Sequence, residues 1–496
     1  MPAIRVLTAL DQARTQYYHF KAIVIAGMGL FTDSYDLFCI APVMKLIGRV
    51  YYEPSGGGAP GVTPPAVVSA TVGVALLGAV AGNLAFGALG DRAGRRRVYG
   101  ASLLLMVCSS VGSGFSVCRT RGCALASLCL FRFLLGAAIG GDYPLSATIM
   151  SEFANRRTRG AFIAAVFSMQ GFGILASSAA TMAVAAAFDR CTGRRAPLDT
   201  PEAADIAWRV ILVLGALPAV VTLYWRMAMP ETARYTALVD HDVVKATNDI
   251  GRVLTELNLG AVTEEEAAAF RRAPPPQPGR ASCGGTGIYQ PWFPPAGRVN
   301  AFQETFNVAK FQAIIAAAST IPGYFAAVLL IDRVGRRRLQ MAGFLLMAVF
   351  LLALAGPYDR YWRGHAATGA GSGAAGKLGA LVGAIGFLWA SQDRDKGKVM
   401  AGYEPGIGMK YALIILCGIC LLGLAVTYVF TPETMGRSLE ENESENDDSR
   451  SHAAGKGGAG QRCQQELAGS ELPKSPASVV SSHLSTSPIH PHRFSV

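Results

Sequence analysis

Charged residues are scarce in this sequence. Asp, Glu, Lys and Arg make up only 16% of the 496 residues, whereas a water-soluble chain of ordinary composition carries about 25%. The ten cysteines show no paired spacing typical of a metal site, and the N-terminus has no cleavable signal pattern. A nucleophile elbow and a P-loop are also missing. These absences argue against an ordinary soluble enzyme, and no cofactor is expected.

Apolar residues and glycine are abundant instead. Hydrophobic residues make up 51% of the chain, glycine occurs 56 times, and the mean hydropathy is +0.32. Because a spanning helix needs about 20 apolar residues, this composition predicts a polytopic membrane protein. No β-barrel alternation is found, so an all-α fold is predicted. Ten stretches are long enough to be considered as spans: 20–47, 66–90, 98–117, 123–150, 161–187, 207–229, 311–331, 340–356, 374–390 and 411–430.

The basic residues are distributed as in a membrane protein. The formal net charge is +11, but the arginines lie in short clusters between apolar stretches, where cytoplasmic loops collect positive charge. In the first half, basic loops follow the second, fourth and sixth stretches. We therefore predict a multi-pass protein with a cytoplasmic N-terminus and C-terminus, in contact with lipid and not with nucleic acid.

Two motifs occur twice, in the same order. The segment 91–97, DRAGRRR, returns as DRVGRRR at 332–338, and Pro-Glu-Thr at 230–232 returns at 432–434. Two repeated motifs predict two helical halves related as parallel repeats, which is the major facilitator architecture. We predict a cytoplasmic gating motif in the residues that open the two copies: Asp91, Arg92, Asp332 and Arg333.

The second half is shorter than the first. The interval from Asp91 to Pro230 exceeds that from Asp332 to Pro432 by about one helix and its loop. The stretch at about 271–298 is rich in proline and glycine and cannot span a membrane. About ten of the twelve spans are therefore predicted, and the second half lacks its first and fourth helices.

The missing helices also affect the predicted orientation. The loop before 311–331 is predicted to be cytoplasmic, so a lone span there would place the arginines at 336–338 on the outside. This violates the positive-inside rule, and 311–331 and 340–356 are therefore expected to be inverted or not inserted. Four parts are predicted: an N-terminal six-helix half 1–229, a cytoplasmic central loop 230–309, a shortened C-terminal half 310–430 and a disordered cytoplasmic tail 431–496.

Three carboxylates lie within predicted spans, where a charge costs about 2.5–3.5 kcal/mol. Asp33 and Asp36 are three residues apart on one helix face, and we interpret them as a proton-binding pair. A structural ion pair with Lys45 or a loop arginine is the alternative. Asp142 lies in Gly-Gly-Asp-Tyr-Pro, where glycine and proline loosen the helix, and is interpreted as part of a binding site. A kinked packing contact is the alternative.

Three further polar residues occur in apolar stretches. Arg132 lies about 15 Å from Asp142 along the same helix, and it either neutralises an anion or pairs with a carboxylate. Gln170 either takes part in the site or forms a hydrogen bond between helices. Lys377 either lies in the pathway or extends to the membrane interface.

The cysteines are given two different interpretations. Cys118 and Cys123 flank one short loop and could form a disulfide, but free thiols are the preferred interpretation. Cys417 and Cys420 lie inside an apolar stretch and are interpreted as small core residues.

One segment resembles a known family. The sequence GGDYPLSATIMSE at 140–152 is similar to the signature of the plant and fungal inorganic phosphate:proton symporters, a branch of the major facilitator superfamily. The resemblance covers most of 15–236 and 286–445, and it is closest to the plant members. Four further stretches support it: 32–38, 167–173, 230–236 and 373–377.

The resemblance implies roles for the matching residues. Tyr143 and Gln170 would contact phosphate, and Lys377 would lie in the pathway from the second half. The proton route would contain Asp33, Asp36 and Asp142, with Arg132 as the partner of Asp142. The family also places binding residues on the two helices that this chain lacks.

Proton-coupled uptake of inorganic phosphate across the plasma membrane by alternating access is therefore the leading hypothesis. A facilitator of another solute such as a sugar is a second hypothesis, because the ending at 432–438 is shared with sugar porters. A third is a truncated form that does not transport, or a regulatory form that pairs with related transporter subunits.

Overall fold

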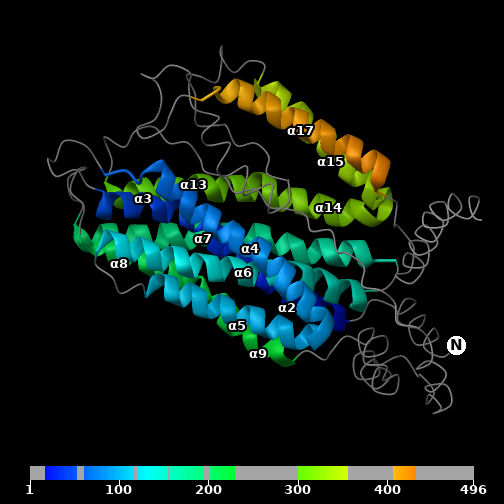
Figure 1. Ribbon diagram of the computed structural model, residues 1–496, viewed down its shortest axis with the longest axis horizontal. Coiled ribbons are helices and arrows are strands. Elements are labelled where there is room, and N and C mark those ends of the chain that lie inside the picture. Colours follow the sequence, from blue (N-terminus) through cyan, green and yellow to red (C-terminus); the bar gives the residue numbers. More distant parts are fainter. Residues whose placement is uncertain are drawn as a thin grey trace, which may run out of the picture. The chain divides into compact units, whose positions relative to one another are not determined.

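The computed structural model describes residues 17–52, 61–115, 120–154, 157–193, 202–228, 300–355 and 406–431. All regular secondary structure in these residues is helical, as predicted (Figure 1). The elements follow in the order α2 (Tyr17–Phe38), α3 (Ile40–Tyr51), α4 (Pro65–Ala93), α5 (Arg95–Gly114), α6 (Arg121–Phe153), α7 (Arg159–Thr192), α8 (Ala203–Leu214), α9 (Ala216–Ala228), α13 (Ala301–Ile315), η1 (Ala316–Thr320), α14 (Ile321–Val334), α15 (Arg336–Ala355) and α17 (Met409–Phe430).

Seven segments of the described chain are long and apolar enough to cross a membrane: Phe20–Tyr51, Ala66–Gly90, Arg121–Phe153, Arg159–Thr192, Ala203–Ala228, Ala301–Val334 and Lys410–Val429. The helices α5 and α15, which each begin with three arginines, occupy the positions predicted for the third and eighth spans. The predicted ninth span, most of the central loop and nearly all of the tail lie outside the described residues.

Three of the spans are interrupted within the membrane-crossing length. The span Phe20–Tyr51 breaks at Cys39, between α2 and α3, and the span Ala203–Ala228 breaks at Gly215, between α8 and α9. The span Ala301–Val334 contains the π-helix η1 just before Pro322. Proline lacks an N–H and its ring clashes with the carbonyl four residues earlier, so a wider turn relieves the clash there.

Glycines bring α4 and α6 into backbone contact. A Cβ atom at Gly136 would lie 1.9 Å from the carbonyl oxygen of Ala75, and one at Gly140 would lie 2.2 Å from that of Ala79. The reverse contacts, from Gly78 and Gly82 on α4 to the backbone of α6, are equally close. Small residues spaced four apart allow this approach, and van der Waals packing then stabilises the pair.

The two copies of the repeated basic motif make matching contacts in the structure. Gly94 and Gly335, which precede the two arginine clusters, have nearly the same positive φ of 93° and 99°. Arg96 donates to the carbonyl of Met227 at the end of α9, and Arg337 donates to that of Tyr428 at the end of α17. Each basic motif is thereby joined to the last helix of its own half.

The direction of the α13–α14 span differs from the prediction. We call the end of the helices that carries the basic clusters the inner end, and the opposite end the outer end. Arg49, at the end of α3, contacts Glu304 at the outer end, and the backbone N–H of Ala161, at the start of α7, donates to Asp332 at the inner end. This span and α15 are therefore not inverted relative to the first half, because their arginines lie at the inner end; the other expectation, that they do not insert, stays a prediction.

The ends of the described helices locate the missing spans. Residues 229–299 connect the inner end of α9 to the outer end of α13, yet they contain no apolar stretch long enough to span. Helices α15 and α17 lie side by side (Figure 1). Because Arg337 joins the start of α15 to the end of α17, residues 356–405 begin and end at the outer end. They contain one such stretch, 374–390, so each interval is one span short.

We predict that Gly136→Ala lowers the melting temperature of the purified protein. The new methyl group would overlap the α4 backbone, and overpacking of this kind costs about 1–3 kcal/mol. The matched control is Gly122→Ala on the same helix, where an added Cβ meets nothing within 4 Å. Equal melting temperatures for the two variants would contradict the close packing of α4 and α6.

Candidate functional site

Four helices, α2, α5, α6 and α9, enclose a buried polar site in the first half. Asp33 and Asp36 on α2, Asp142 on α6 and Arg226 on α9 are at most 2% exposed. A fourth helix, α5, supplies Tyr99, which is also buried. Charged groups in such a place must be paired, because desolvation of an isolated charge is too costly.

Asp142 is paired with Arg226. One guanidinium nitrogen, Nη1, lies 2.5 Å from Asp142 Oδ1, and Nη2 lies 3.2 Å from Oδ2. Both side chains are 0% exposed. A bidentate pair fixes the orientation of both groups, as a single contact would not.

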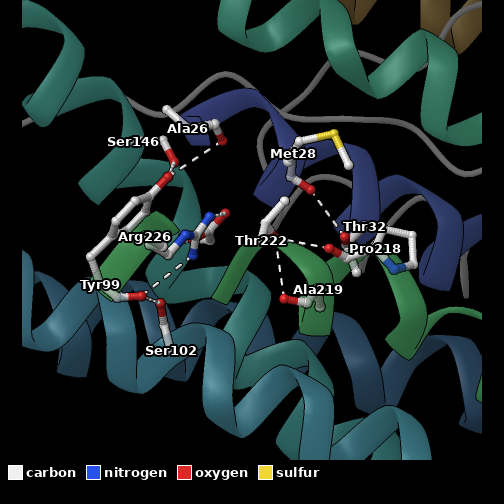
Figure 2. Close-up of polar contacts among 11 residues, drawn as sticks. Ala26, Met28, Thr32, Tyr99, Ser102, Ser146, Pro218, Ala219, Thr222 and Arg226 are labelled. Carbon is white, nitrogen blue, oxygen red and sulfur yellow. Dashed lines mark hydrogen bonds and ion pairs between the residues drawn. The ribbon is translucent and has the colours of Figure 1, made fainter. Parts of the chain in front are cut away.

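Tyr99 holds the arginine in place. The guanidinium carbon of Arg226 lies 3.6 Å from the centre of the Tyr99 ring, and Arg226 also donates to the Tyr99 carbonyl at 3.4 Å. Figure 2 shows the Tyr99 hydroxyl between Ser146 and the carbonyl of Ala26, at 2.8 and 3.4 Å. The cation therefore rests on an aromatic face that is itself anchored to α2 and α6.

Asp36 lies in a separate cluster. Its Oδ2 accepts a hydrogen bond from Ser110 on α5 at 2.6 Å, and its backbone carbonyl accepts one from Arg132 Nη1 at 2.6 Å. Arg132 also interacts electrostatically with the Asp36 carboxylate. Gly215, at the break between α8 and α9, lies against this carboxylate: a Cβ there would lie 2.0 Å from Asp36 Oδ1, so a larger residue would displace the Asp36 side chain.

These contacts change one expectation. Arg132 contacts Asp36, and the partner of Asp142 is Arg226 instead, because ten residues of α6 separate Arg132 from Asp142. The interpretation of Asp33 and Asp36 as a proton-binding pair stays a prediction.

The residues expected to contact phosphate lie on α6 and α7. Tyr143 is 1% exposed and its ring lies 5.9 Å from that of Phe167, three residues before Gln170. Gln170 is also 1% exposed and accepts a hydrogen bond from Tyr324 on α14 at 3.3 Å. Gln170 thus joins the two halves, as the helix-contact alternative predicted, and its Nε2 has no hydrogen-bond partner among the described residues. Lys377 lies outside the described residues.

The second copy of the predicted gating motif joins α14 to α7 at the inner end. Asp332 Oδ2 accepts from the N–H of Ala161 at 2.7 Å, in the first turn of α7, where exposed N–H groups favour an anion. Arg336 lies 3.6 Å from the same carboxylate. Arg92 and Arg333 are exposed, and the side chain of Asp91 lies outside the described residues.

A set of ion pairs joins α13 to α3 at the outer end. Glu304, in the first turn of α13, accepts from Arg49 Nη2 at 3.0 Å and lies 3.4 Å from Lys45 Nζ. Lys45 is therefore a partner of Glu304. Asn300 at the start of α13 donates to Asp189 near the end of α7, at 2.7 Å. The helix Ala301–Val334 is tied to the first half at both ends.

Two of the described cysteines differ in their roles. Cys123 is disulfide-bonded, so the preferred interpretation of a free thiol is wrong for this residue. Cys417 is buried and its thiol donates to the carbonyl of Ala348, which is a packing role. Within the part of the chain that the structure describes, no group of three metal-ligating side chains occurs.

Several members of the site were not predicted from the sequence: Tyr99, Ser110, Arg226, Glu304 and Tyr324. Arg226 carried a usable signal, since an arginine close to the end of an apolar stretch either extends to the interface or pairs with an acid. The others are common residue types whose partners depend on which helices are neighbours.

Comparisons with known proteins identify the family. Residues 21–273 match the family described as Sugar (and other) transporter. Two rice proteins (Oryza sativa subsp. japonica), named probable inorganic phosphate transporter 1-10 and 1-9, are 67% and 65% identical over the full length of both chains. The chain belongs to the plant inorganic phosphate transporter family. A member from Arabidopsis thaliana, probable inorganic phosphate transporter 1-9, is 47% identical to this transporter over 90% of its length and 96% of the relative's.

Solved structures place the transporter in the major facilitator fold. Two structures of the proton:xylose symporter XylE match with TM-scores of 0.58 and 0.60 at 17% identity, covering 86% of this chain and 98% of theirs. The alignments with the two rice relatives run over 568 and 584 positions, more than the 496 residues here. Both relatives therefore carry segments without a counterpart in this chain, which agrees with the two missing spans.

We predict that Arg226→Met destabilises the transporter by about 3–5 kcal/mol, because it leaves Asp142 as a buried charge without its partner. The double variant Arg226→Met/Asp142→Asn should recover most of this loss. Thermal unfolding of both variants measures the coupling between the two residues.

The matched control is Arg209→Met, which removes the arginine of an acid–arginine pair at the outer end. Arg209 and Asp205 are 17% and 34% exposed, so the loss there should be about 0–1 kcal/mol. A double variant no more stable than Arg226→Met would show that the pair is not coupled.

Proposed function

We propose that this chain takes up inorganic phosphate together with protons across the plasma membrane. The observation that carries the proposal is the buried acidic and polar site of α2, α6 and α7 in a member of the phosphate transporter family. Rice and Arabidopsis relatives bear the name inorganic phosphate transporter, and XylE is named a proton:xylose symporter.

The chemistry of the site suits phosphate. At neutral pH phosphate is an anion that still carries protons, so it offers O–H donors to carboxylates and an acceptor surface to donors. Tyr143 and the Nε2 group of Gln170 would donate to phosphate oxygens. Fully ionised sulfate has no proton to give, so acidic acceptors discriminate against it.

Proton uptake offsets the charge of the substrate. Moving one negative charge inward against an inside-negative potential costs about 2.3 kcal/mol per 100 mV. A proton that enters on Asp33, Asp36 or Asp142 neutralises part of that charge. The coupling therefore makes uptake of an anion possible at a resting potential.

Alternating access would use the two ends of the helix Ala301–Val334. Glu304 with Arg49 and Lys45 closes the outer end, and Asp332 with the start of α7 closes the inner end. When the contacts at one end break while those at the other end hold, the site opens to one side of the membrane only. The cytoplasmic termini proposed from the basic loops make the inner end the cytoplasmic side.

Uptake of radiolabelled phosphate by cells that lack their own high-affinity system tests the proposal. We expect uptake that rises at acid pH, resists competition by sulfate and glucose, and is lost in Asp142→Asn and Gln170→Ala. Arg209→Met, away from the site, should retain uptake. Competition by glucose would favour a sugar facilitator, and a fluorescent fusion reports whether the protein reaches the cell surface.

The span count favours a second candidate function, a form that does not transport. Each of the intervals 229–299 and 356–405 is one span short, and the rice relatives carry segments that are absent here. A chain whose second half lacks two membrane spans would not transport by itself and would act by pairing with related transporter subunits.

A chimera separates the two functions. The segments of the rice relative without a counterpart are inserted into this chain, and phosphate uptake is compared with that of the unmodified chain at equal surface expression. If only the chimera takes up phosphate, the chain is a non-transporting form. Equal uptake by both proteins would overturn that candidate.

A further inference from the structure

A hydroxyl group of the second half contacts Gln170, one of the residues predicted to bind phosphate. Tyr324, on α14, donates from its hydroxyl to Gln170 Oε1 on α7 at 3.3 Å. An amide has an acceptor end and a donor end, so a donor bound at the oxygen fixes which end points where. The other end, Nε2, is buried and has no hydrogen-bond partner among the described residues. The contact therefore leaves the donor end of the amide for another group.

The π-helix η1 turns Tyr324 toward the first half. An α-helix turns about 100° per residue, so Gln312 on α13 and Tyr324 would lie about 120° apart on a continuous α-helix. The turn η1 lies between them and accommodates one extra residue, which brings the two to within about 20° of each other. Both accordingly contact the first half, since Gln312 donates to the carbonyl of Phe38 on α2 at 3.3 Å.

The ring of Tyr324 is held against α7 independently of its hydroxyl. A Cβ at Gly171 would lie 3.5 Å from Tyr324 Cδ2 and 3.0 Å from Ile321 Cγ1, so the backbone of α7 lies against α14 here. The neighbouring rings of Phe172 and Phe325 meet edge to face, with centres 6.3 Å apart. These apolar contacts place the hydroxyl, and they remain when the hydroxyl alone is removed.

The orientation of the Gln170 amide decides whether it attracts or repels an anion. The nitrogen end carries two N–H donors, whereas the oxygen end carries lone pairs and a partial negative charge. A phosphate oxygen therefore binds at Nε2 and is repelled at Oε1. An amide that turns freely presents the wrong end for part of the time. A group that fixes the amide beforehand strengthens binding without touching the ligand.

We propose that Tyr324 is a positioning residue for phosphate. Its hydroxyl holds the Gln170 amide with Oε1 toward α14 and Nε2 toward the substrate, and the hydroxyl itself does not touch phosphate. The inference rests on the proposed function, because it takes phosphate as the ligand of Gln170. It adds a residue of the second half to a site whose other described phosphate-binding candidates, Tyr143 and Gln170, belong to the first half.

Phosphate binding to the purified full-length chain in lipid nanodiscs tests the proposal. The dissociation constant of radiolabelled inorganic phosphate is measured by scintillation proximity, so no transport is needed. We expect Tyr324→Phe to raise the dissociation constant about two- to tenfold, which corresponds to the loss of one hydrogen bond. Gln170→Ala should raise it about tenfold or more, because a hydrogen bond to a charged ligand is lost. Binding at millimolar phosphate is followed through the rise in melting temperature.

The double variant Tyr324→Phe/Gln170→Ala separates positioning from other roles. If Tyr324 acts through Gln170, loss of the hydroxyl has no further effect once the amide is gone, so the double variant binds phosphate as Gln170→Ala does. A purely structural role, or direct contact of Tyr324 with phosphate, would weaken binding by the same factor in both backgrounds and would overturn the proposal. Unchanged binding by Tyr324→Phe would overturn it as well.

Tyr224→Phe is the matched control. Tyr224 lies on α9 and is 76% exposed, so the loss of its hydroxyl should leave phosphate binding unchanged. The wild-type chain reports on the proposed function: if it binds no phosphate, that function fails and the inference fails with it. If wild type binds phosphate and Tyr324→Phe binds it equally well, the inference alone fails.

Discussion

The ion pair between Arg226 and Asp142 is the contact on which the first half depends. It joins α6 to α9 where neither side chain is exposed, and its immediate surroundings are supplied by α2 through Gly29 and by α5 through Tyr99. In lipid and protein, neither charge has water as a substitute partner. The close approach of these four helices is therefore a condition for satisfying two charges.

The class of the protein and most of its helices could be predicted from the sequence. Long apolar stretches and clustered arginines are local signals, and the repeated motifs at 91–97 and 332–338 carry the two-half architecture directly. The site could be predicted in part. Asp33, Asp36 and Asp142 stand out because charge is rare in a span, but Arg226 was overlooked, and its pairing with Asp142 depends on how α6 and α9 pack.

The direction of the span Ala301–Val334 shows where reasoning from single spans fails. The positive-inside rule and a count of crossings predict an inverted span. The structure has the opposite direction, because Glu304 and Asp332 each find partners on the first half that they would lose on inversion. Specific polar contacts between helices thus set the direction of this span, which a count of crossings predicts wrongly. The missing crossings then fall in the intervals 229–299 and 356–405, each of which is one span short.

The order of the ion pair along the chain has a consequence for biosynthesis. Asp142 is translated well before Arg226, so its carboxylate is already within the bilayer when α9 leaves the ribosome. An arginine that enters the membrane alone costs about 2.5–3.5 kcal/mol, whereas one that meets a waiting carboxylate does not bear that cost unaided. The arginine of α9 therefore has its partner in the membrane when it is inserted, because Asp142 precedes it along the chain.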